Sequence, residues 1–158
     1  MVWLCEAHTP DDSSRKQGNY ISAYAPVKTE FNDQECLLAA LADNGVCNYM
    51  NVEVHETPVH LIGYHSDSRP EVANIVIRRS EVGGASNDIG FVKDNDGKYT
   101  AIISDYDSHR HGTKWMTAVK ASYTEKRAVK EMKRQGLRFM SREKIGNKIV
   151  VKYLKQGA

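Results

Sequence analysis

Four side chains that can bind a metal ion occur at every second position between residues 105 and 111. They are Asp105, Asp107, His109 and His111. On an extended strand this spacing would place all four on one face. Carboxylate and imidazole groups suit zinc, manganese or iron, and an open position for water would make the site hydrolytic. The pattern predicts a metal-assisted phosphoester hydrolase as one alternative. The other is a solvated polar loop whose aspartates cap the following helix.

A second candidate site is the positive charge in the last third of the chain. From Lys114 onward there are 13 Lys or Arg and 3 Asp or Glu, so this part carries +10, whereas the rest carries −8. Residues three and four apart share a helix face, which predicts a basic surface for an anionic ligand or an acidic protein surface. The alternative is a solvated outer helix face. The candidate anion- or partner-binding residues are Lys126, Lys130, Lys133, Arg134 and Arg138.

Two weaker patterns lie in the middle of the chain. The stretch Gly83-Gly84-Ala85-Ser86-Asn87 could offer backbone N–H groups to a phosphate, but it lacks the spacing of a P-loop and precedes a strand. A plain loop is the alternative. His55, His60 and His65 recur every five residues, a period of neither strand nor helix, so we interpret them as independent.

The elements that must position these residues follow from capping, periodicity and turn signals. Asn32 as N-cap with Glu35 three residues later predicts a helix over 33–44, with Gly45 after its end. The sequence Asp94-Asn95-Asp96-Gly97 predicts a tight turn between two strands. Strands are expected at residues 20–31, with an edge position indicated by Pro26, and at 52–55, 59–64, 73–79, 88–93 and 99–105, with a loop at 80–87.

The basic segment 114–135 has two apolar stripes on nearly opposite sides, one around Val119 and Tyr123 and one around Val129 and Met132. Either a break near Ser122–Thr124 re-phases the chain, or one helix lies between two surfaces. We expect the break. Gly136 should end the helix, and two strands, 137–143 and 148–154, should follow around a turn at Gly146.

Short turns between most strands predict a mainly antiparallel sheet. The expected fold is therefore α+β: a two-layer sandwich with two helices on one face of the sheet. Residues 1–21 are interpreted as an N-terminal arm and residues 22–158 as a single domain. The odd number of cysteines and the absence of a signal-peptide core or membrane-length apolar run predict a cytoplasmic protein that does not enter membranes.

This layout resembles an uncharacterised family that includes the hypothetical chloroplast reading frame 35 proteins and their cyanobacterial, bacterial and phage relatives. The resemblance runs from Ala23 to Leu154. It rests on four stretches: Val27–Phe31 with the following helix, Asn74–Arg78, Asp88–Val92 with the Asp94–Gly97 turn, and Tyr123 through Gly136 into the last strands. It implies a fold and no catalytic residues. Its phage members imply a viral accessory or counter-defence role as one option.

These observations support three hypotheses about function. The first is a small non-enzymatic binding protein, without a cofactor, that contacts a nucleotide, a nucleic acid or an acidic protein surface through the basic C-terminal third. The second is the metal-assisted hydrolase centred on Asp105–His111. The third is a structural or assembly protein, and self-association into a homo-oligomer is compatible with the opposite charges of the two parts of the chain.

Overall fold

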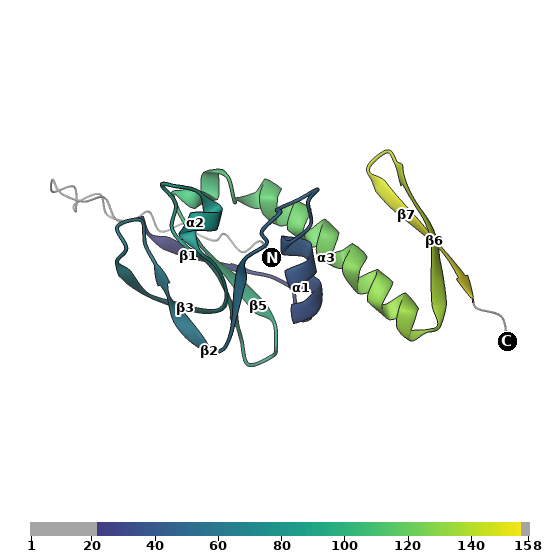
Figure 1. Ribbon diagram of the computed structural model, residues 1–158, viewed down its shortest axis with the longest axis horizontal. Coiled ribbons are helices and arrows are strands. Elements are labelled where there is room, and N and C mark those ends of the chain that lie inside the picture. The colour runs from purple at the N-terminus through teal and green to yellow at the C-terminus, as the bar shows by residue number, and fades with distance from the viewer. Residues whose placement is uncertain (1–21, 156–158) are drawn as a thin grey trace, which may run out of the picture.

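The computed structural model describes residues 22–155, so the expected arm over residues 1–21 lies outside the described residues. Five antiparallel strands form the main sheet in the order β1-β5-β4-β3-β2 (Figure 1). The elements are β1 Tyr24–Lys28, α1 Gln34–Leu41, β2 Val52–Ile62, β3 Ser68–Ile77, α2 Arg79–Val82, β4 Ile89–Lys93, β5 Tyr99–Ser104, the 3-10 helix η2 Asp107–His109, α3 Thr113–Arg134, β6 Leu137–Ile145 and β7 Lys148–Lys155.

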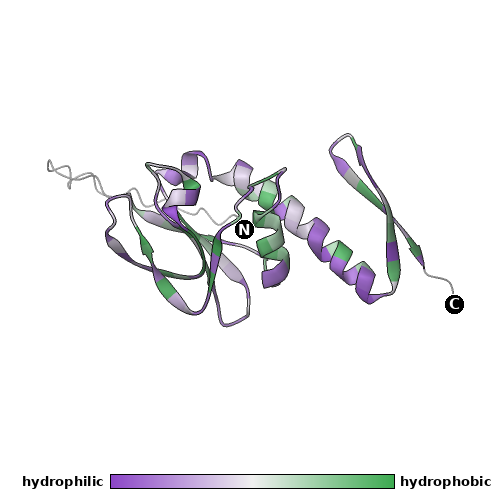
Figure 2. Ribbon diagram, in the orientation of Figure 1, coloured by the Kyte–Doolittle hydropathy of each residue, from purple (hydrophilic) through white to green (hydrophobic). Residues whose placement is uncertain are grey.

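The helices α1 and α3 contact each other and pack against the sheet, which confirms the α+β fold with a mainly antiparallel sheet. The main core lies between these layers and includes Leu37, Leu41, Phe91, Tyr99 and Val119, all at most 1% exposed. Its apolar character is visible on α1 in Figure 2, where the later turns of α3 are mostly hydrophilic. No helix among the described residues is long and apolar enough to cross a membrane.

Both edges of the sheet carry a proline within a strand. Pro26 lies in β1, which pairs only with β5 in the main sheet, so the expected edge position is confirmed. Pro58 lies in β2, the other edge, where the register shifts between Val54 and Val59. The sequence predicted two strands there, at 52–55 and 59–64. They form a single strand, because an edge strand can contain a proline and an irregularity and still keep its hydrogen bonds to the neighbouring strand.

The limits of α1 differ from the sequence prediction. Asp33, not Asn32, is the N-cap, and its Oδ1 atom accepts a hydrogen bond from Cys36 N at 2.9 Å. The side chain of Asn32 instead accepts a hydrogen bond from the Tyr123 hydroxyl at 3.1 Å. This contact with a distant part of the chain replaces the helix-capping hydrogen bond that we expected. The helix ends at Leu41 rather than at 44, and Asn48, not Gly45, has the positive φ in the connection that follows.

The expected break in α3 is wrong, because the helix is continuous from Thr113 to Arg134. Its first apolar stripe packs into the main core through Val119 and Tyr123. Its second half extends along α1 and towards β6, so Val129 faces a different surface from Val119. A 22-residue helix is about 33 Å long, so its two halves can contact different elements without a break in the helix.

The predicted turns at the ends of strands are confirmed. Asp94 Oδ1 accepts hydrogen bonds from Asp96 N and Lys98 N, and Gly97 has a φ of 81°. Gly136 follows α3 with a φ of 72° and is the expected stop. The segment 80–87 is not wholly a loop, since α2 forms one helical turn at its start.

The last two strands form a separate two-stranded sheet at the C-terminal end of α3 (Figure 1). The strands β6 and β7 pair from Leu137↔Lys155 to Ile145↔Lys148, with one irregularity between Phe139 and Ser141. An ion pair between Arg142 and Glu125, at 2.7 Å, ties β6 to α3. We refer to residues 137–155 as the C-terminal hairpin.

Candidate functional site

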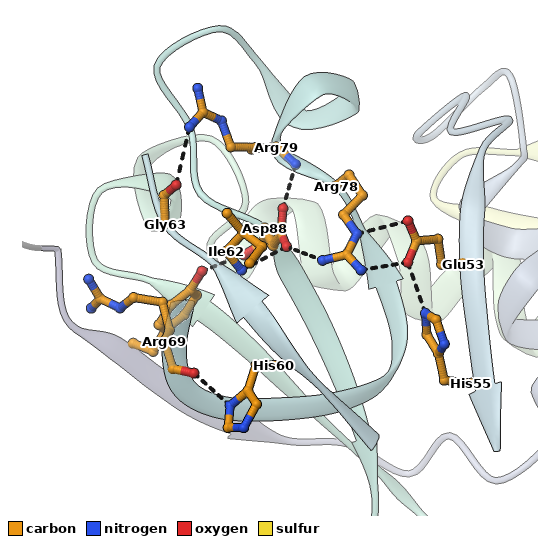
Figure 3. A network of polar contacts seen from close by, with 10 residues as sticks. Glu53, His55, His60, Ile62, Gly63, Arg69, Arg78, Arg79 and Asp88 are labelled. Atoms are coloured by element: carbon orange, nitrogen blue, oxygen red, sulfur yellow. Dashed lines mark hydrogen bonds and ion pairs between the residues drawn. The ribbon is translucent and has the colours of Figure 1, made fainter. Parts of the chain in front are cut away.

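The most buried charged group of the sheet is the carboxylate of Asp88, which is 0% exposed and lies just before β4. Its Oδ2 atom accepts hydrogen bonds from Ile62 N at 2.8 Å and Arg78 Nη1 at 2.7 Å, and Oδ1 accepts one from Arg79 N at 2.7 Å (Figure 3). A buried carboxylate is stable only when it is paired and hydrogen-bonded in this way.

Arg78 extends this network across the sheet to β2. Its Nε and Nη2 atoms donate to the two carboxylate oxygens of Glu53, at 2.8 and 2.7 Å, which is the two-pronged geometry that arginine favours (Figure 3). This contact with Arg78 holds the pKa of Glu53 at about 2, below its usual range. His55 Nε2 also contacts Glu53, at 2.8 Å.

This network fixes both ends of the segment 79–87. The side chain of Asp88, just after the segment, accepts a hydrogen bond from the backbone N–H of Arg79 at its start. Arg79 also donates from Nη1 to the carbonyl oxygens of Gly63 and Tyr64, so the turn after β2 is held to α2. The role of these charges is therefore to position the glycine-containing loop 83–87.

The second anchor of that loop is Asp107, whose side chain is 3% exposed. Its Oδ2 atom accepts hydrogen bonds from Asn87 N at 3.0 Å, Asn87 Nδ2 at 3.1 Å and Ser104 Oγ at 2.6 Å. The structure thereby brings together two segments that form separate candidate patterns in the sequence, the loop 83–87 and the turn 105–111. They line a shared cavity of about 320 Å³ that includes Gly84, His109 and Arg110.

The four proposed metal ligands are not brought to one face. The segment that contains them includes the 3-10 helix η2 and is not an extended strand. Its side chains therefore do not alternate between two faces as the prediction assumed. Asp107 is held by Asn87 and Ser104, and Asp105 accepts a hydrogen bond from Tyr106 N. Within residues 22–155, no three His, Cys, Asp or Glu side chains are arranged to hold a metal ion.

His111 faces a different environment from His109. It is 6% exposed, and its Nε2 atom shares a hydrogen bond of 2.6 Å with the Tyr49 hydroxyl. Burial lowers the pKa of His111 and raises the pKa of Tyr49 to about 12. The His111 ring lies edge-on to Trp115, with centroids 5.1 Å apart, so this histidine packs at the start of α3.

The other three histidines among residues 22–155 have separate partners. His55 contacts Glu53, and His60 Nδ1 lies 2.8 Å from the carbonyl oxygen of Arg69. His65 lies against Tyr64, with ring centroids 4.9 Å apart. These three contacts lie at different places, as the five-residue period indicates.

The basic face of α3 is partly neutralised within the molecule. Lys130 Nζ lies 2.8 Å from Asp33 and 2.7 Å from Glu35, and Lys126 lies 3.4 Å from Asp43, so both lysines hold α1 against α3. Arg134 pairs with Glu131 on its own helix. Among the described residues, Lys133 and Arg138 have no ion-pair partner, and both are exposed.

Sequence reasoning missed Asp88, Arg78 and Glu53 as positioning residues. A signal was present for two of them, because Arg78 directly follows the apolar run of β3 and Asp88 directly precedes that of β4. A charge at the end of a buried strand often has a partner there. The pairing of the two could not be read from the chain, since no spacing rule links residues across a loop.

Comparison with known proteins yields a family and no nearer relative. No curated protein and no solved structure matches the chain. One family model, described as "Protein of unknown function (DUF1257)", matches residues 46–148. The match begins before β2 and extends to the first residue of β7, so it covers the charged network, the loop 83–87, α3 and most of the hairpin. The chain therefore belongs to the DUF1257 family, a family of unknown function.

Proposed function

We propose that this protein is a non-enzymatic binding protein that docks onto an acidic protein surface through the C-terminal hairpin and the adjoining end of α3. The observation that carries the proposal is the composition of the hairpin surface. It combines positive charges that have no ion-pair partner among residues 22–155 with large exposed apolar side chains, on an element that stands apart from the main sheet.

The charges of the hairpin are strongly one-sided. Residues 137–155 contain six Lys or Arg and a single acidic residue, Glu143. Arg142 pairs with Glu125 and Lys152 with Glu143. In the part of the chain that the structure describes, the remaining cations of the hairpin have no ion-pair partner: Arg138, Lys144, Lys148 and Lys155. By the strand register, Arg138 and Lys148 lie on one face of the hairpin and Lys144 and Lys155 on the other. Together with Lys133 they give this end of the molecule a positive charge that would steer an acidic partner towards it.

The apolar side chains of the hairpin explain why the partner is a protein. Phe139, Met140, Ile145 and Leu154 are 49 to 60% exposed. Phe139 could stack on a base, but Met140, Ile145 and Leu154 are not aromatic and gain little from a nucleic acid, whose unspecific contacts are phosphates and stacked bases. Such side chains are buried in the centre of protein interfaces. An isolated two-stranded hairpin is marginally stable in water, so a partner that covers it would also stabilise it.

The resemblance to the hypothetical chloroplast reading frame 35 proteins forms a second part of the proposal. The stretches that carry it supply the end of β1 with α1, the end of β3, β4 with the turn that follows it, and the second half of α3 with the last two strands. We propose that the chain shares an evolutionary origin with these proteins. A role as a phage accessory or counter-defence protein is consistent with a small binding protein of this kind, because a docking surface alone can carry out such a role.

The test is capture of host proteins by the full chain and three matched double variants. Arg138→Glu with Lys148→Glu reverses hairpin charges, and Met140→Ser with Ile145→Ser removes apolar area. Lys28→Glu with Lys93→Glu is the charge-matched control, because both lysines are exposed on the main sheet, away from the hairpin. Captured proteins are identified by mass spectrometry after nuclease treatment, and each candidate is then purified for titration.

A purified acidic protein that binds the wild type and the control, and binds both hairpin variants at least about tenfold more weakly, supports the proposal. Equal binding by all four forms would refute it. Binding that nuclease abolishes, and that the apolar variant retains, identifies a nucleic acid in place of a protein. Concentration-dependent sedimentation of the wild type alone, lost in the hairpin variants, identifies a second copy of this chain as the occupant.

A further inference from the structure

The loop 83–87 and the turn at 106–110 enclose a cavity whose open groups suit an anion. In the described part of the chain, the N–H groups of Gly84 and Ala85 have no hydrogen-bond acceptor, whereas those of Gly83, Ser86 and Asn87 are all used. A methyl group built on Gly84 would meet no heavy atom within 4 Å, so the backbone there is open to a ligand. Two consecutive free N–H groups in a loop form a recognised anion-binding feature.

The positively charged guanidinium of Arg110 and the imidazole of His109 also line this cavity. Both side chains are exposed, and neither has an ion-pair partner among residues 22–155. The Arg110 Nη1 atom lies 3.9 Å from the position that a Cβ atom of Gly83 would occupy, so the guanidinium reaches the loop. Arginine and backbone N–H groups converging on one volume are the usual partners of a phosphate.

Asp107 also lines the cavity, and its negative charge opposes an anion. Its carboxylate is 3% exposed, however, and its Oδ2 atom accepts three hydrogen bonds from Asn87 and Ser104. Its effect is to hold the loop in place behind the cavity. The exposed groups that a ligand would meet first are therefore Arg110 and His109.

A second cavity, of about 420 Å³, adjoins the first and shares Ala85 and Tyr106 with it. Its walls include the rings of Tyr64 and His65, and Tyr106 is 48% exposed between the two cavities. Asp67 and Arg69 also line this second cavity, and the Asp67 Oδ2 atom lies 3.3 Å from Arg69 Nη1. Flat rings suit the stacking of a base, and a carboxylate accepts hydrogen bonds from a sugar hydroxyl or an exocyclic amino group.

We propose that the two joined cavities bind a nucleoside monophosphate group. Its phosphate accepts hydrogen bonds from Gly84 N, Ala85 N and the Arg110 guanidinium, and its base stacks on Tyr106. This site lies on the loops that the Asp88 and Asp107 carboxylates position, and it uses no residue of the C-terminal hairpin. It is therefore independent of the docking surface proposed above, and hairpin variants should leave it unchanged.

The experiment is isothermal titration of the full chain with AMP, with inorganic phosphate and with adenosine, at low salt. Arg110→Gln removes the phosphate partner, and Tyr106→Ala removes the stacking ring. Lys28→Gln is the control, since it removes one exposed cation from β1, which lines neither cavity. Circular dichroism of each variant confirms that it is folded. A short 5′-phosphorylated RNA serves as a further probe, because the same group occurs on free nucleotides and at RNA ends.

We expect AMP to bind the wild type and the control equally, and Arg110→Gln to weaken AMP binding by about tenfold or more. Tyr106→Ala should weaken AMP binding and leave phosphate binding unchanged. Binding of AMP but not of the RNA assigns the site to free nucleotides. Equal binding of AMP and the RNA assigns it to the 5′-phosphorylated ends of RNA. The proposal is overturned if the wild type binds neither AMP nor phosphate at millimolar concentration, or if Arg110→Gln and Tyr106→Ala bind AMP as the wild type does.

Discussion

The guanidinium of Arg78 lies 2.7 Å from the buried carboxylate of Asp88, and this contact joins the end of β3 to the start of β4. Between the two residues the chain forms α2 and the loop 83–87, which lines both proposed ligand cavities. The pair is thus the structural link between the sheet and the loop that lines both cavities.

Replacing Asp88 by Asn should destabilise the protein by about 3 kcal/mol, because one partner of a buried ion pair is lost while its donors stay buried. The measurement is the free energy of unfolding in urea. Asp96→Asn is the matched control, since Asp96 is exposed in the β4–β5 turn. A loss for Asp88→Asn no larger than that for the control would contradict the role assigned to this carboxylate.

Stability should fall as the pH is lowered through the acidic range, with Glu53 as one cause. The contact with Arg78 depresses its pKa from 4.5 to about 2, so the folded state keeps the carboxylate ionised where the unfolded chain takes up a proton. The contribution is complete above about pH 4.5 and is lost as the pH falls towards 2. Urea unfolding at a series of pH values measures this slope. Glu53→Gln should flatten it, whereas Glu56→Gln, which removes an exposed carboxylate without an ion-pair partner in the described residues, should not.

Asp33→Ala should cost about 1–2 kcal/mol, because the N-cap of α1 is lost together with the contacts to Arg127 and Lys130. Asp33→Ser separates the two effects, since serine caps a helix without charge. Thermal and urea unfolding should place the serine variant between the wild type and the alanine variant. If serine and alanine are equally destabilised, the cap hydrogen bond to Cys36 contributes nothing.

Gly90→Ala should destabilise the sheet by about 1–3 kcal/mol, because a methyl group at this position would overpack a filled interior. The new Cβ would lie 2.6 Å from Ala73 Cβ and 3.0 Å from a methyl carbon of Leu61. Gly84→Ala is the control, since a Cβ there meets nothing within 4 Å. Comparison of the two unfolding free energies checks the prediction, which is wrong if both changes are tolerated equally.

Patterns with a local cause were predicted correctly. The Asp94–Gly97 turn, the stop at Gly136, the antiparallel sheet and the edge position of Pro26 each depend on a few neighbouring residues. The cap at Asn32 and the break in α3 were wrong for a common reason. Tyr123 binds the Asn32 side chain, and different surfaces cover the two halves of α3, so contacts from distant parts of the chain overrode the local signal.

For the candidate sites too, the features that depend on composition were predicted, whereas the contacts between distant residues were not. The basic composition of the C-terminal third was evident from the chain, but the ion pairs of Lys126 and Lys130 with α1 were not. A charge count cannot show which cations already have partners. The four possible metal ligands appeared as one set because an extended strand was assumed, and the 3-10 helix η2 removed that alternation.

Periodicity, turn residues and composition were enough to predict the α+β class, both main helices, most of the strands and the accumulation of positive charge at the C-terminal end. That Arg78 meets Asp88, that the loop 83–87 faces Arg110, and that the last two strands stand apart as a hairpin became evident only from the folded chain. Buried charges and cavities arise where distant segments pack together, so their partners are set by that packing rather than by spacing along the chain.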